Sequence, residues 1–154
     1  MKKKFNGLWL FGLSGSGKSY LSKKISTFID NSFIIDGDFV RSEISYDLGY
    51  SKKDRVIQNK RVLGIAKMAI KNNYFPIISS VYLDKNVATL AKKNKIKIIN
   101  ICIKNDEKNN IKLKSKKNVV GRSIRQPFVA CDKFINNFKK GNDIKIYVKK
   151  NILR

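Results

Sequence analysis

Short apolar runs alternate with amphipathic segments along the whole chain. Runs rich in Ile, Val and aromatic residues are typical of buried strands, whereas apolar residues at every third or fourth position predict helices. The expected strands cover residues 7–12, 32–35, 74–80, 96–103 and 131–135, and the expected helices cover residues 18–29, 39–48, 51–72, 84–94 and 143–153. This alternation favours an α/β fold of three layers (α/β/α), with a five-strand parallel sheet covered by helices on both faces.

Local signals support several of these boundaries. Ser51 and Asp54 form a capping box at the start of the long helix, since each side chain can bind the other residue's backbone amide. Gly49 is a stop signal for the preceding helix. Residues 104–117 are rich in Lys and Asn with weak periodicity, and we expect a mobile lid at about 104–126. The chain otherwise fits one domain, residues 1–154.

A phosphate-loop motif joins the first strand to the first helix. The residues are Gly12, Leu13, Ser14, Gly15, Ser16, Gly17, Lys18 and Ser19, which match G-x-x-x-x-G-K-[ST]. The strand–loop–helix context disfavours the alternative, a chance glycine-rich turn. Backbone amides of such a loop surround the β-phosphate, while the lysine contacts the β- and γ-phosphates and the hydroxyl binds Mg²⁺. The motif predicts a P-loop NTPase fold that binds ATP and Mg²⁺, with Lys18 catalytic and Ser19 a metal ligand.

Two carboxylates, Asp36 and Asp38, follow the second strand. Ligands of open α/β sheets lie beyond the carboxyl ends of the strands, so Gly12, Asp36 and Ser79 are expected to converge at one edge. A carboxylate there can hold Mg²⁺ or accept the proton of an attacking hydroxyl. We therefore expect both acids to be catalytic and Asp36 to be a metal ligand. A structural role, compatible with this one, is an Asx turn in which Asp38 caps the next helix.

The order of these motifs resembles the adenylylsulfate kinase family. The resemblance rests on residues 12–19, then Asp36-Gly37-Asp38-Phe39-Val40-Arg41, Asp47-Leu48-Gly49-Tyr50-Ser51, Asp54-Arg55 and Arg61-Val62, in register from about residue 7 to 82. That family uses Mg-ATP to phosphorylate the 3′-hydroxyl of adenosine 5′-phosphosulfate. The resemblance implies that this chain converts adenylylsulfate to 3′-phosphoadenylylsulfate. An Asn-Lys-x-Asp guanine-binding motif is absent from the sequence, which disfavours a GTPase.

By position, the resemblance also implies an acceptor site. Arg41 and Arg55 would bind the acceptor's phosphate and its anionic substituent, which suits planar, permanently charged guanidinium groups. Tyr50 stands where the family stacks the acceptor base. For Arg61, a surface ion pair is the preferred interpretation. The acceptor-binding candidates are Asp38, Phe39, Arg41, Tyr50, Arg55, Gln58 and Ser79.

The sequence departs from the family around this site. Phe39 and Gln58 replace asparagines, and Ile78-Ser79-Ser80-Val81-Tyr82 replaces an Ile-Ser-Pro-Tyr-Arg loop. The family's Lys-Gly-Leu-Tyr-Lys-Lys lid is absent, and residues 118–124 stand in its place. The replacement resembles a divergent branch from capsule and surface-polysaccharide gene clusters that includes a cytidine diphosphoramidate kinase. A cytidine nucleotide is therefore the alternative acceptor.

A lid residue is expected to neutralise the phosphoryl group during transfer. Arg122 is the candidate for this contact with ATP, because the preceding Gly121 permits a close approach. Lys116 and Lys117 are alternatives, although a lysine run of this kind is commonly just solvated.

Composition narrows the classes of partner. The formal net charge is +23, but the lysines are spread along the whole chain among Asn and Ile, which indicates a composition bias. We expect a small, anionic, nucleotide-like acceptor as the partner, and nucleic acid is disfavoured. A P-loop nucleic-acid-binding ATPase remains the alternative of another class. A homodimer is compatible with the sequence.

No sequence feature predicts a membrane or secreted location. No run approaches the roughly 18 apolar residues of a membrane span. The apolar residues 5–11 lack a small-residue cleavage site, so we expect a core strand and a cytoplasmic protein. Cys102 and Cys131 belong to no CxxC pair and are expected to be reduced. The chain has no histidine, which excludes catalysis or zinc binding by that residue.

Overall fold

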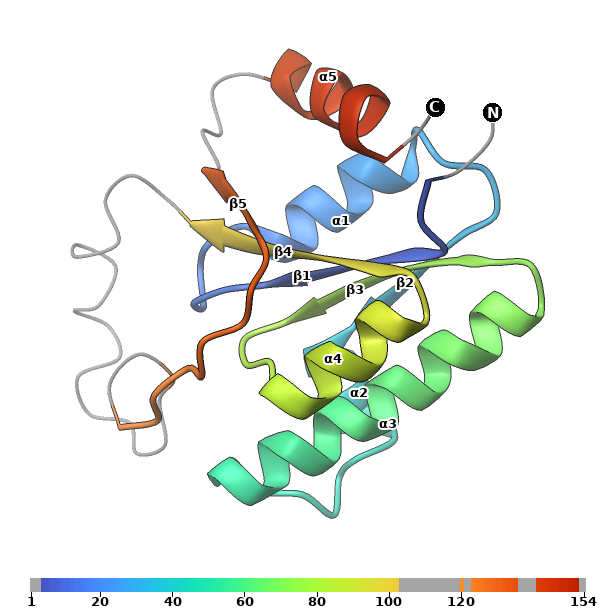
Figure 1. Ribbon diagram of the computed structural model, residues 1–154. Helices are drawn as coiled ribbons and strands as arrows, with labels where there is room; N and C mark the ends of the chain where they lie inside the picture. The colour runs from blue at the N-terminus through green and yellow to red at the C-terminus, as the bar shows by residue number, and fades with distance from the viewer. Residues whose placement is uncertain (1–3, 103–119, 121–122, 136–140, 153–154) are drawn as a thin grey trace.

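A computed structural model describes residues 4–102, 120, 123–135 and 141–152 of the chain. The described residues form the five strands and five helices that the sequence predicts, with two consecutive helices after the second strand (Figure 1). The strands are β1 (Gly7–Phe11), β2 (Ser32–Asp36), β3 (Phe75–Ser80), β4 (Ile96–Cys102) and β5 (Asp132–Ile135); the helices are α1 (Lys18–Ser26), α2 (Gly37–Glu43), α3 (Lys52–Lys71), α4 (Lys85–Lys93) and α5 (Gly141–Asn151). The sheet order is β2-β3-β1-β4-β5, and every neighbouring pair is parallel.

Helices cover both faces of the sheet, which confirms the three-layer α/β/α prediction. Helices α1 and α5 lie on one face, and α3 and α4 lie on the other (Figure 1). Side chains of β1 alternate between the two layers, since Leu8 and Leu10 join the α1/α5 core while Trp9 and Phe11 join the α3/α4 core. A strand buried on both faces therefore needs the continuous apolar run seen in the sequence.

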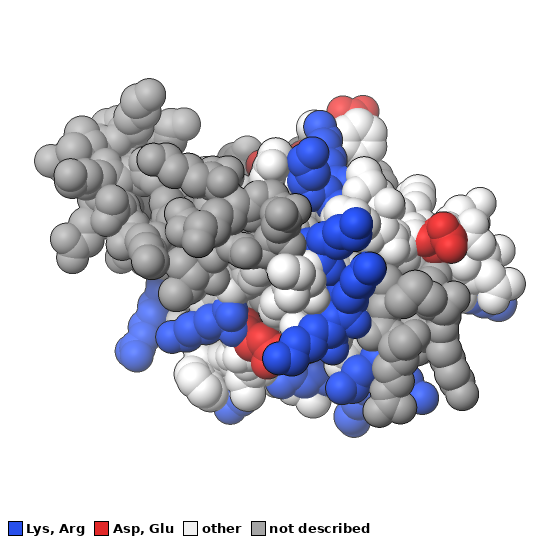
Figure 2. All heavy atoms as spheres, turned by 90° about the horizontal axis from the view of Figure 1, so that it is seen from above, with Lys and Arg blue, Asp and Glu red and all other residues white. Residues whose placement is uncertain are grey.

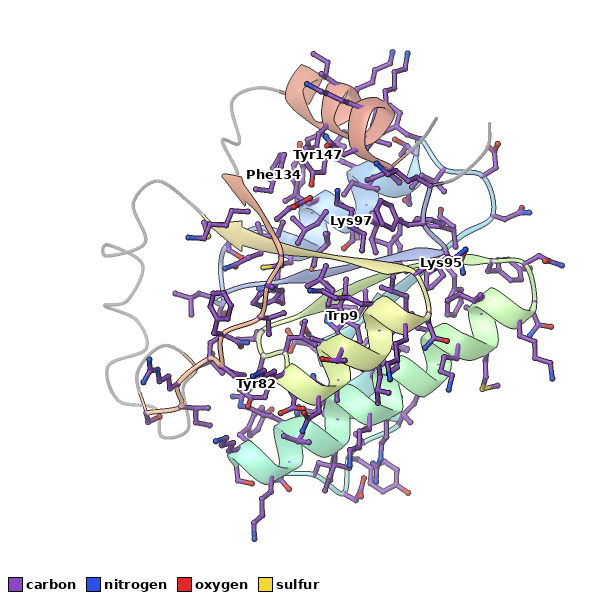
Figure 3. The ribbon with its side chains drawn as sticks, viewed as in Figure 1. Trp9, Tyr82, Lys95, Lys97, Phe134 and Tyr147 are labelled. Carbon is purple, nitrogen blue, oxygen red and sulfur yellow. The ribbon has the colours of Figure 1, made fainter. Side chains whose placement is uncertain are left out.

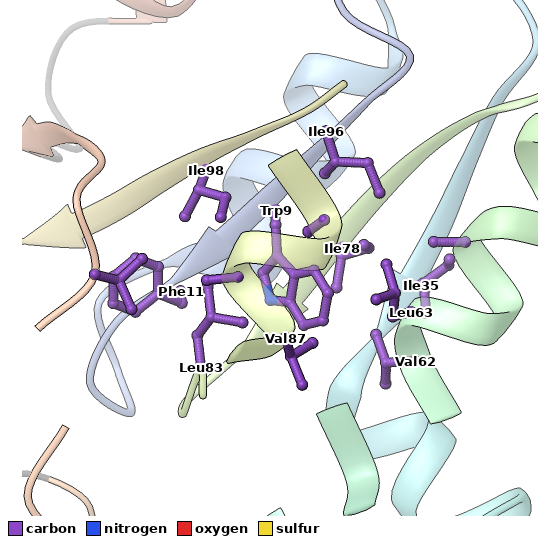
Figure 4. Packing of buried hydrophobic residues seen from close by; sticks show 14 of the residues in the cluster. Trp9, Phe11, Ile35, Val62, Leu63, Ile78, Leu83, Val87, Ile96 and Ile98 are labelled. Carbon is purple, nitrogen blue, oxygen red and sulfur yellow. The ribbon is translucent and has the colours of Figure 1, made fainter. Parts of the chain in front are cut away.

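Trp9 lies at the centre of the α3/α4 core. Its ring packs among Ile78, Val87 and neighbouring apolar side chains (Figure 4). Its indole nitrogen donates a hydrogen bond of 2.8 Å to Ser80 Oγ, so the polar end of this buried ring is satisfied. This contact also fixes the end of β3, from which the candidate site begins.

The predicted bounds of α3 and α4 hold to within one residue at each end, whereas α5 covers Gly141–Asn151 rather than 143–153. The capping box of Ser51 and Asp54 is present at the start of α3. Helix α1 ends at Ser26 rather than at residue 29. Helix α2 covers Gly37–Glu43 rather than 39–48, because Asp36 caps it early and the chain turns back after Glu43. This turn brings Gly49 to Arg41, whose Nη1 donates a 2.5 Å hydrogen bond to the glycine carbonyl.

Several other expectations concern the rest of the chain. Cys102 and Cys131 are not joined in a disulfide, and both residues are half-buried. Among the described residues, no helix is both long and apolar enough to cross a bilayer. Most of the expected lid at 104–126 lies outside the described residues. Cytoplasmic location and the single-domain boundary remain predictions.

Candidate active site

The phosphate loop connects the end of β1 to the start of α1. Gly12 has no room for a side chain, because a Cβ there would lie 2.3 Å from the carbonyl oxygen of Ile101 on β4. Gly15 and Gly17 have φ angles of +82° and +85°, in the left-handed region that favours glycine. The glycines of the motif are thus required by the path of the chain, which closes a tight loop at the N-terminus of α1.

Lys18 holds its amine over this loop. Nζ donates hydrogen bonds to the Leu13 carbonyl, at 2.8 Å, and to Ser16 Oγ, at 3.4 Å. Burial lowers the pKa of Lys18 to about 8, and the nearby carboxylates of Asp38 and Asp36 oppose part of that change. The ammonium group of Lys18 is therefore partly desolvated, and a bound anion would stabilise its charged form.

The carboxylate of Asp36 accepts four hydrogen bonds. Its Oδ2 accepts hydrogen bonds from Ser19 Oγ, at 2.8 Å, and from Ser79 Oγ, at 3.1 Å. Its Oδ1 accepts from the backbone amides of Asp38 and Phe39, at 2.9 and 3.4 Å. Burial raises the pKa of Asp36, but these hydrogen bonds outweigh it and the pKa lies below its ordinary value. The carboxylate stays ionised.

The same contacts correct one sequence prediction. Asp36, not Asp38, is the N-cap of α2. The last residue of β2 reaches the first amides of the helix that follows directly, and Asp38 already lies inside that helix. The side chain of Asp38 is consequently not used as a cap.

These groups line one cleft of about 230 Å³. The predicted convergence of the strand ends is confirmed, since Asp36 and Ser79 are paired in register on β2 and β3. The lining residues are Ser14, Gly15, Gly17, Lys18, Ser19, Tyr20, Asp36, Asp38, Ser79, Ser80 and Val81. An amine, two carboxylates and several hydroxyls thus surround a space at the head of α1.

A second group of predicted residues lies beside the cleft without lining it. Arg41 and Arg55 both lie over the ring of Tyr50, with guanidinium carbons 5.0 and 5.8 Å from its centre. Arg55 Nε also donates a 3.2 Å hydrogen bond to the Tyr50 carbonyl. Burial lowers the pKa of Arg55, and the nearby charge of Arg41 lowers it further, while Asp38 opposes both effects. The guanidinium groups of Arg41 and Arg55 therefore lie near each other in a partly buried position, which favours the binding of an anion there.

The other described residues considered for the site from the sequence do not line the cleft. Gln58 is buried beneath α2, where its Nε2 donates to the Gly37 carbonyl at 3.1 Å, and its Oε1 has no hydrogen-bond partner within the described part of the chain. Phe39 is exposed on α2. Arg61 forms an ion pair with Asp47 at 2.5 and 2.8 Å, which confirms the structural interpretation of that residue. Arg122 lies outside the described residues.

Tyr82 is a residue that the sequence prediction missed. It lies where β3 ends, near the start of α4 (Figure 3), and its side chain is 2% exposed. It forms a buried cluster with Val120 and Ile124, and Leu13 of the phosphate loop packs against this cluster. Its hydroxyl is buried and has no hydrogen-bond partner among the residues that the structure describes, and a buried hydroxyl left without one costs about 1–3 kcal/mol. Burial raises the pKa of this phenol, as does Asp84, and Arg55 opposes both.

Tyr82 thus belongs to a cluster against which Leu13 of the phosphate loop packs, and Arg55 is near enough to affect its pKa. The only sequence signal was that Tyr82 replaces the arginine of the family's loop. A tyrosine directly after a strand otherwise indicates a core residue, which its burial also fits.

The order of the strands, the phosphate loop and the paired acids define a P-loop fold of the nucleotide-dependent kinase type. The model of the family described as adenylylsulphate kinase matches residues 5–118 of the chain. The chain belongs to this family.

Known proteins agree with this assignment over part of the chain. Adenylyl-sulfate kinase 3 of Arabidopsis thaliana is 43% identical over 65 residues, which cover 40% of this chain and 31% of that protein. A probable adenylyl-sulfate kinase of Pyrococcus abyssi is 32% identical over 90 residues, or 56% of this chain and 52% of that protein. The matches therefore span about half or less of the curated relatives.

Solved structures are similar over nearly the whole chain. The APS kinase CysC of Mycobacterium tuberculosis, solved in complex with AMPPNP and APS, has a TM-score of 0.76 at 16% identity, covering 93% of this chain and 95% of that one. A gluconokinase of Sinorhizobium meliloti has a TM-score of 0.57 at 13% identity, covering 91% and 87%. At these identities the likeness concerns the fold alone, and kinases of different acceptors share it.

Proposed function

We propose that this chain transfers the terminal phosphoryl group of ATP to a hydroxyl of a small, anionic nucleotide, with adenylylsulfate as the leading acceptor. The observation that carries the proposal is the pair of contacts at Asp36. Through hydrogen bonds to Ser19 and Ser79, this carboxylate joins the phosphate loop to the end of β3 within one cleft. A nucleotide phosphate and an acceptor can thus meet beside the same acid.

The phosphate loop suits the β- and γ-phosphates of ATP. Residues at the start of α1 line the cleft, where helix N-terminal amides can bind phosphate, and Lys18 places a partly desolvated cation there, whose pKa a bound polyphosphate would raise again. Ser19 and Asp36 offer hard oxygen donors 2.8 Å apart, which fit Mg²⁺. When bound, Mg²⁺ would neutralise charge on the phosphates. Asp36 needs no proton transfer to act as its ligand, because its pKa is already lowered.

Asp38 is the acid best placed to receive a proton from the attacking hydroxyl. It lines the cleft, lies in the first turn of α2, and is released from the capping role that Asp36 performs. Its charge also acts on both Lys18 and Arg55. An acceptor hydroxyl between Asp38 and the phosphate loop would be in position for direct transfer, in which orientation and charge neutralisation supply most of the rate.

The arginine group is the proposed place for the acceptor's own anionic groups. Two guanidinium groups over one exposed phenol ring provide charge, planar donors and a stacking surface. Cytidine diphosphoramidate or a related activated nucleotide is the second candidate acceptor. It is favoured by the departures around this group, since Phe39, Gln58 and Tyr82 all differ from the family residues at those positions.

An ADP-release assay with a panel of acceptors tests the proposal. We expect Mg²⁺-dependent ADP release that requires adenylylsulfate, and the product should be 3′-phosphoadenylylsulfate. Release with cytidine diphosphoramidate alone would replace the leading acceptor but keep the reaction. Steeply salt-dependent binding of RNA or single-stranded DNA, with no small molecule phosphorylated, would instead favour the nucleic-acid-binding ATPase.

Arg55→Ala is expected to raise the acceptor KM about 10–100-fold with a much smaller change in kcat. Loss of a charge-assisted contact is worth about 1.5–3 kcal/mol, and each 1.4 kcal/mol is tenfold in affinity. Steady-state kinetics with ATP at saturation measure the effect. Arg61→Ala is the matched control, because this arginine of the same helix is engaged by Asp47. Equal acceptor KM values for the two variants would remove Arg55 from the site.

A further inference from the structure

A second cavity, of about 420 Å³, lies apart from the active-site cleft. Its volume falls within the range of about 300–1,000 Å³ that is usual for small-molecule sites. It is lined by Phe5, by the end of α4, by the start of β4 and by the residues that lead into β5. The cleft and this cavity share no described lining residue, and the cleft lies at the opposite, carboxyl ends of the strands. The cavity is therefore a separate place on the molecule.

The cavity lies where β5 leaves part of β4 uncovered. Strand β5 begins at Asp132, which pairs with Ile99, so the earlier residues of β4 have β1 on one side and no described strand on the other (Figure 1). Among those earlier residues, Ile96 and Ile98 line the cavity and are almost fully buried, and Phe5 adds an aromatic ring. The cavity thus offers apolar and aromatic surface to a ligand.

Positive charge exceeds negative charge around this surface. The charged residues among the described lining are Lys92, Lys95, Lys97 and Asp132. Lys97 and Asp132 compensate each other in an ion pair of 2.7 Å. Lys92 and Lys95 have no carboxylate partner in the described part of the chain. Two uncompensated ammonium groups therefore stand beside the apolar surface.

Contacts with the fold hold these lysines in place. The side chain of Lys97 is only 14% exposed, and its Nζ lies 5.2 Å from the centre of the Phe5 ring. The Nζ of Lys92 donates a hydrogen bond to the carbonyl of Ala130. Lys95 stands where the chain turns from α4 into β4, with a left-handed φ of +56° (Figure 3). A ligand would meet charges that are already partly ordered.

Positive charge alone does not distinguish this cavity. The face of the molecule that carries α5 also shows many more Lys and Arg than Asp and Glu, as expected for a net charge of +23 (Figure 2). What distinguishes the cavity is an almost buried lysine on a strand, together with two uncompensated lysines and a concave apolar surface. Composition bias accounts for solvated lysines but not for this combination.

We propose that this cavity binds a small phosphomonoester whose organic part is flat or apolar. A phosphomonoester carries a charge of about −1.5 to −2 at neutral pH, which matches the ammonium groups of Lys92 and Lys95. Lysine binds phosphate as a point charge. The organic part would lie against Ile96, Ile98 and the ring of Phe5. The proposal does not rest on phosphoryl transfer, because the cavity and the cleft are separate.

An NMR titration with 1-naphthyl phosphate tests the proposal, since this probe combines a phosphomonoester with a flat apolar ring system. Backbone amide signals of residues 95–98 and 130–132 should shift and saturate. Inorganic phosphate, which lacks the rings, and 1-naphthol, which lacks the phosphate, should each bind at least about tenfold more weakly. Lys18→Met, which changes only the phosphate loop, should leave these shifts as they are in wild type.

Lys92→Gln and Lys95→Gln should each weaken binding of the probe at least about tenfold, because each removes one charge-assisted contact. Lys93→Gln is the matched control. Lys93 is exposed in the same last turn of α4, and its replacement changes the net charge equally, but it does not line the cavity. This variant should bind as wild type does. Thermal unfolding of each variant establishes that it is folded.

Three results would overturn the proposal. The first is a titration without saturable shifts at the cavity, including one in which only residues 12–19 respond. The second is a Lys93→Gln variant that loses as much affinity as Lys92→Gln, which would mean that the probe responds to the overall charge of +23. The third is 1-naphthol binding as tightly as 1-naphthyl phosphate, which would mean that the cavity does not select an anion.

Discussion

Lys18→Met is expected to lower kcat by about 10²–10³-fold with every acceptor, the usual effect of removing one preorganised charge from a transition state. The same change should raise the free energy of unfolding at neutral pH. Burial lowers the pKa of Lys18 from 10.5 to about 8, and about 1.4 kcal/mol accompanies each unit, so the buried charge costs about 3 kcal/mol. Methionine keeps the apolar stem without the charge. Loss of the bond to Leu13 offsets part of the gain.

The lowered pKa of Lys18 also predicts how the stability difference between the two proteins changes with pH. In the unfolded chain Lys18 keeps its proton up to about pH 10.5, whereas in the folded chain it loses the proton near pH 8. The cost is therefore fully present below pH 8 and disappears as pH rises from 8 to 10.5. Chemical denaturation of both proteins at pH 7 and above pH 10 measures it. A variant that is less stable than wild type at pH 7 would contradict the assignment of Lys18 as a strained, functional cation.

Loss of activity together with a gain in stability is the result expected on replacing a functional-site residue, not a residue of the hydrophobic core. A core lysine would be expected to support the fold, and its removal would leave a cavity or an unpaired group. Lys18 instead is held by two oxygen atoms of its own loop, in a place where burial opposes its charge. Tyr82 is also unusual for a core residue, because its buried hydroxyl has no hydrogen-bond partner among the described residues.

The sequence was most informative where local chemistry alone determines the structure. The phosphate loop could be predicted because Gly12 has no room for a Cβ and because Gly15 and Gly17 need left-handed backbone. The capping box at Ser51 could be predicted because it involves only residues three positions apart. The ion pair of Arg61 was preferred over a site role on general grounds, and its partner is Asp47.

Features that depend on contacts distant in sequence could not be predicted in the same way. The early end of α2 depends on the turn that brings Gly49 to Arg41. The placement of Tyr82 depends on Val120 and Ile124, about forty residues further along the chain. The place of β2 at one edge of the sheet follows from the strand order, which periodicity does not fix. Acceptor identity belongs to this second class, since it depends on how Arg41, Arg55 and Tyr82 are arranged around one ligand.

Asp36→Asn is expected to lower kcat at least 100-fold and to weaken the Mg²⁺ dependence of ATP binding, with little change in stability. Asparagine caps a helix as well as aspartate, so the bonds to the amides of Asp38 and Phe39 can persist. What is lost is the negative charge beside Ser19, which the proposed metal site requires. Calorimetric titration of ATP with and without Mg²⁺, together with ADP release, measures both effects.

Asp84→Asn is the matched control for this change. Asp84 caps α4 through the amides of Asn86 and Val87, the same geometry by which Asp36 caps α2, but it does not line the cleft. The two variants should have similar melting temperatures and very different rates. If both lost activity equally, the effect of Asp36 would be one of helix capping, and the acid would have no separate role in phosphoryl transfer. Because the caps are equivalent, any difference in rate reports the charge that Asp36 presents to the phosphate loop.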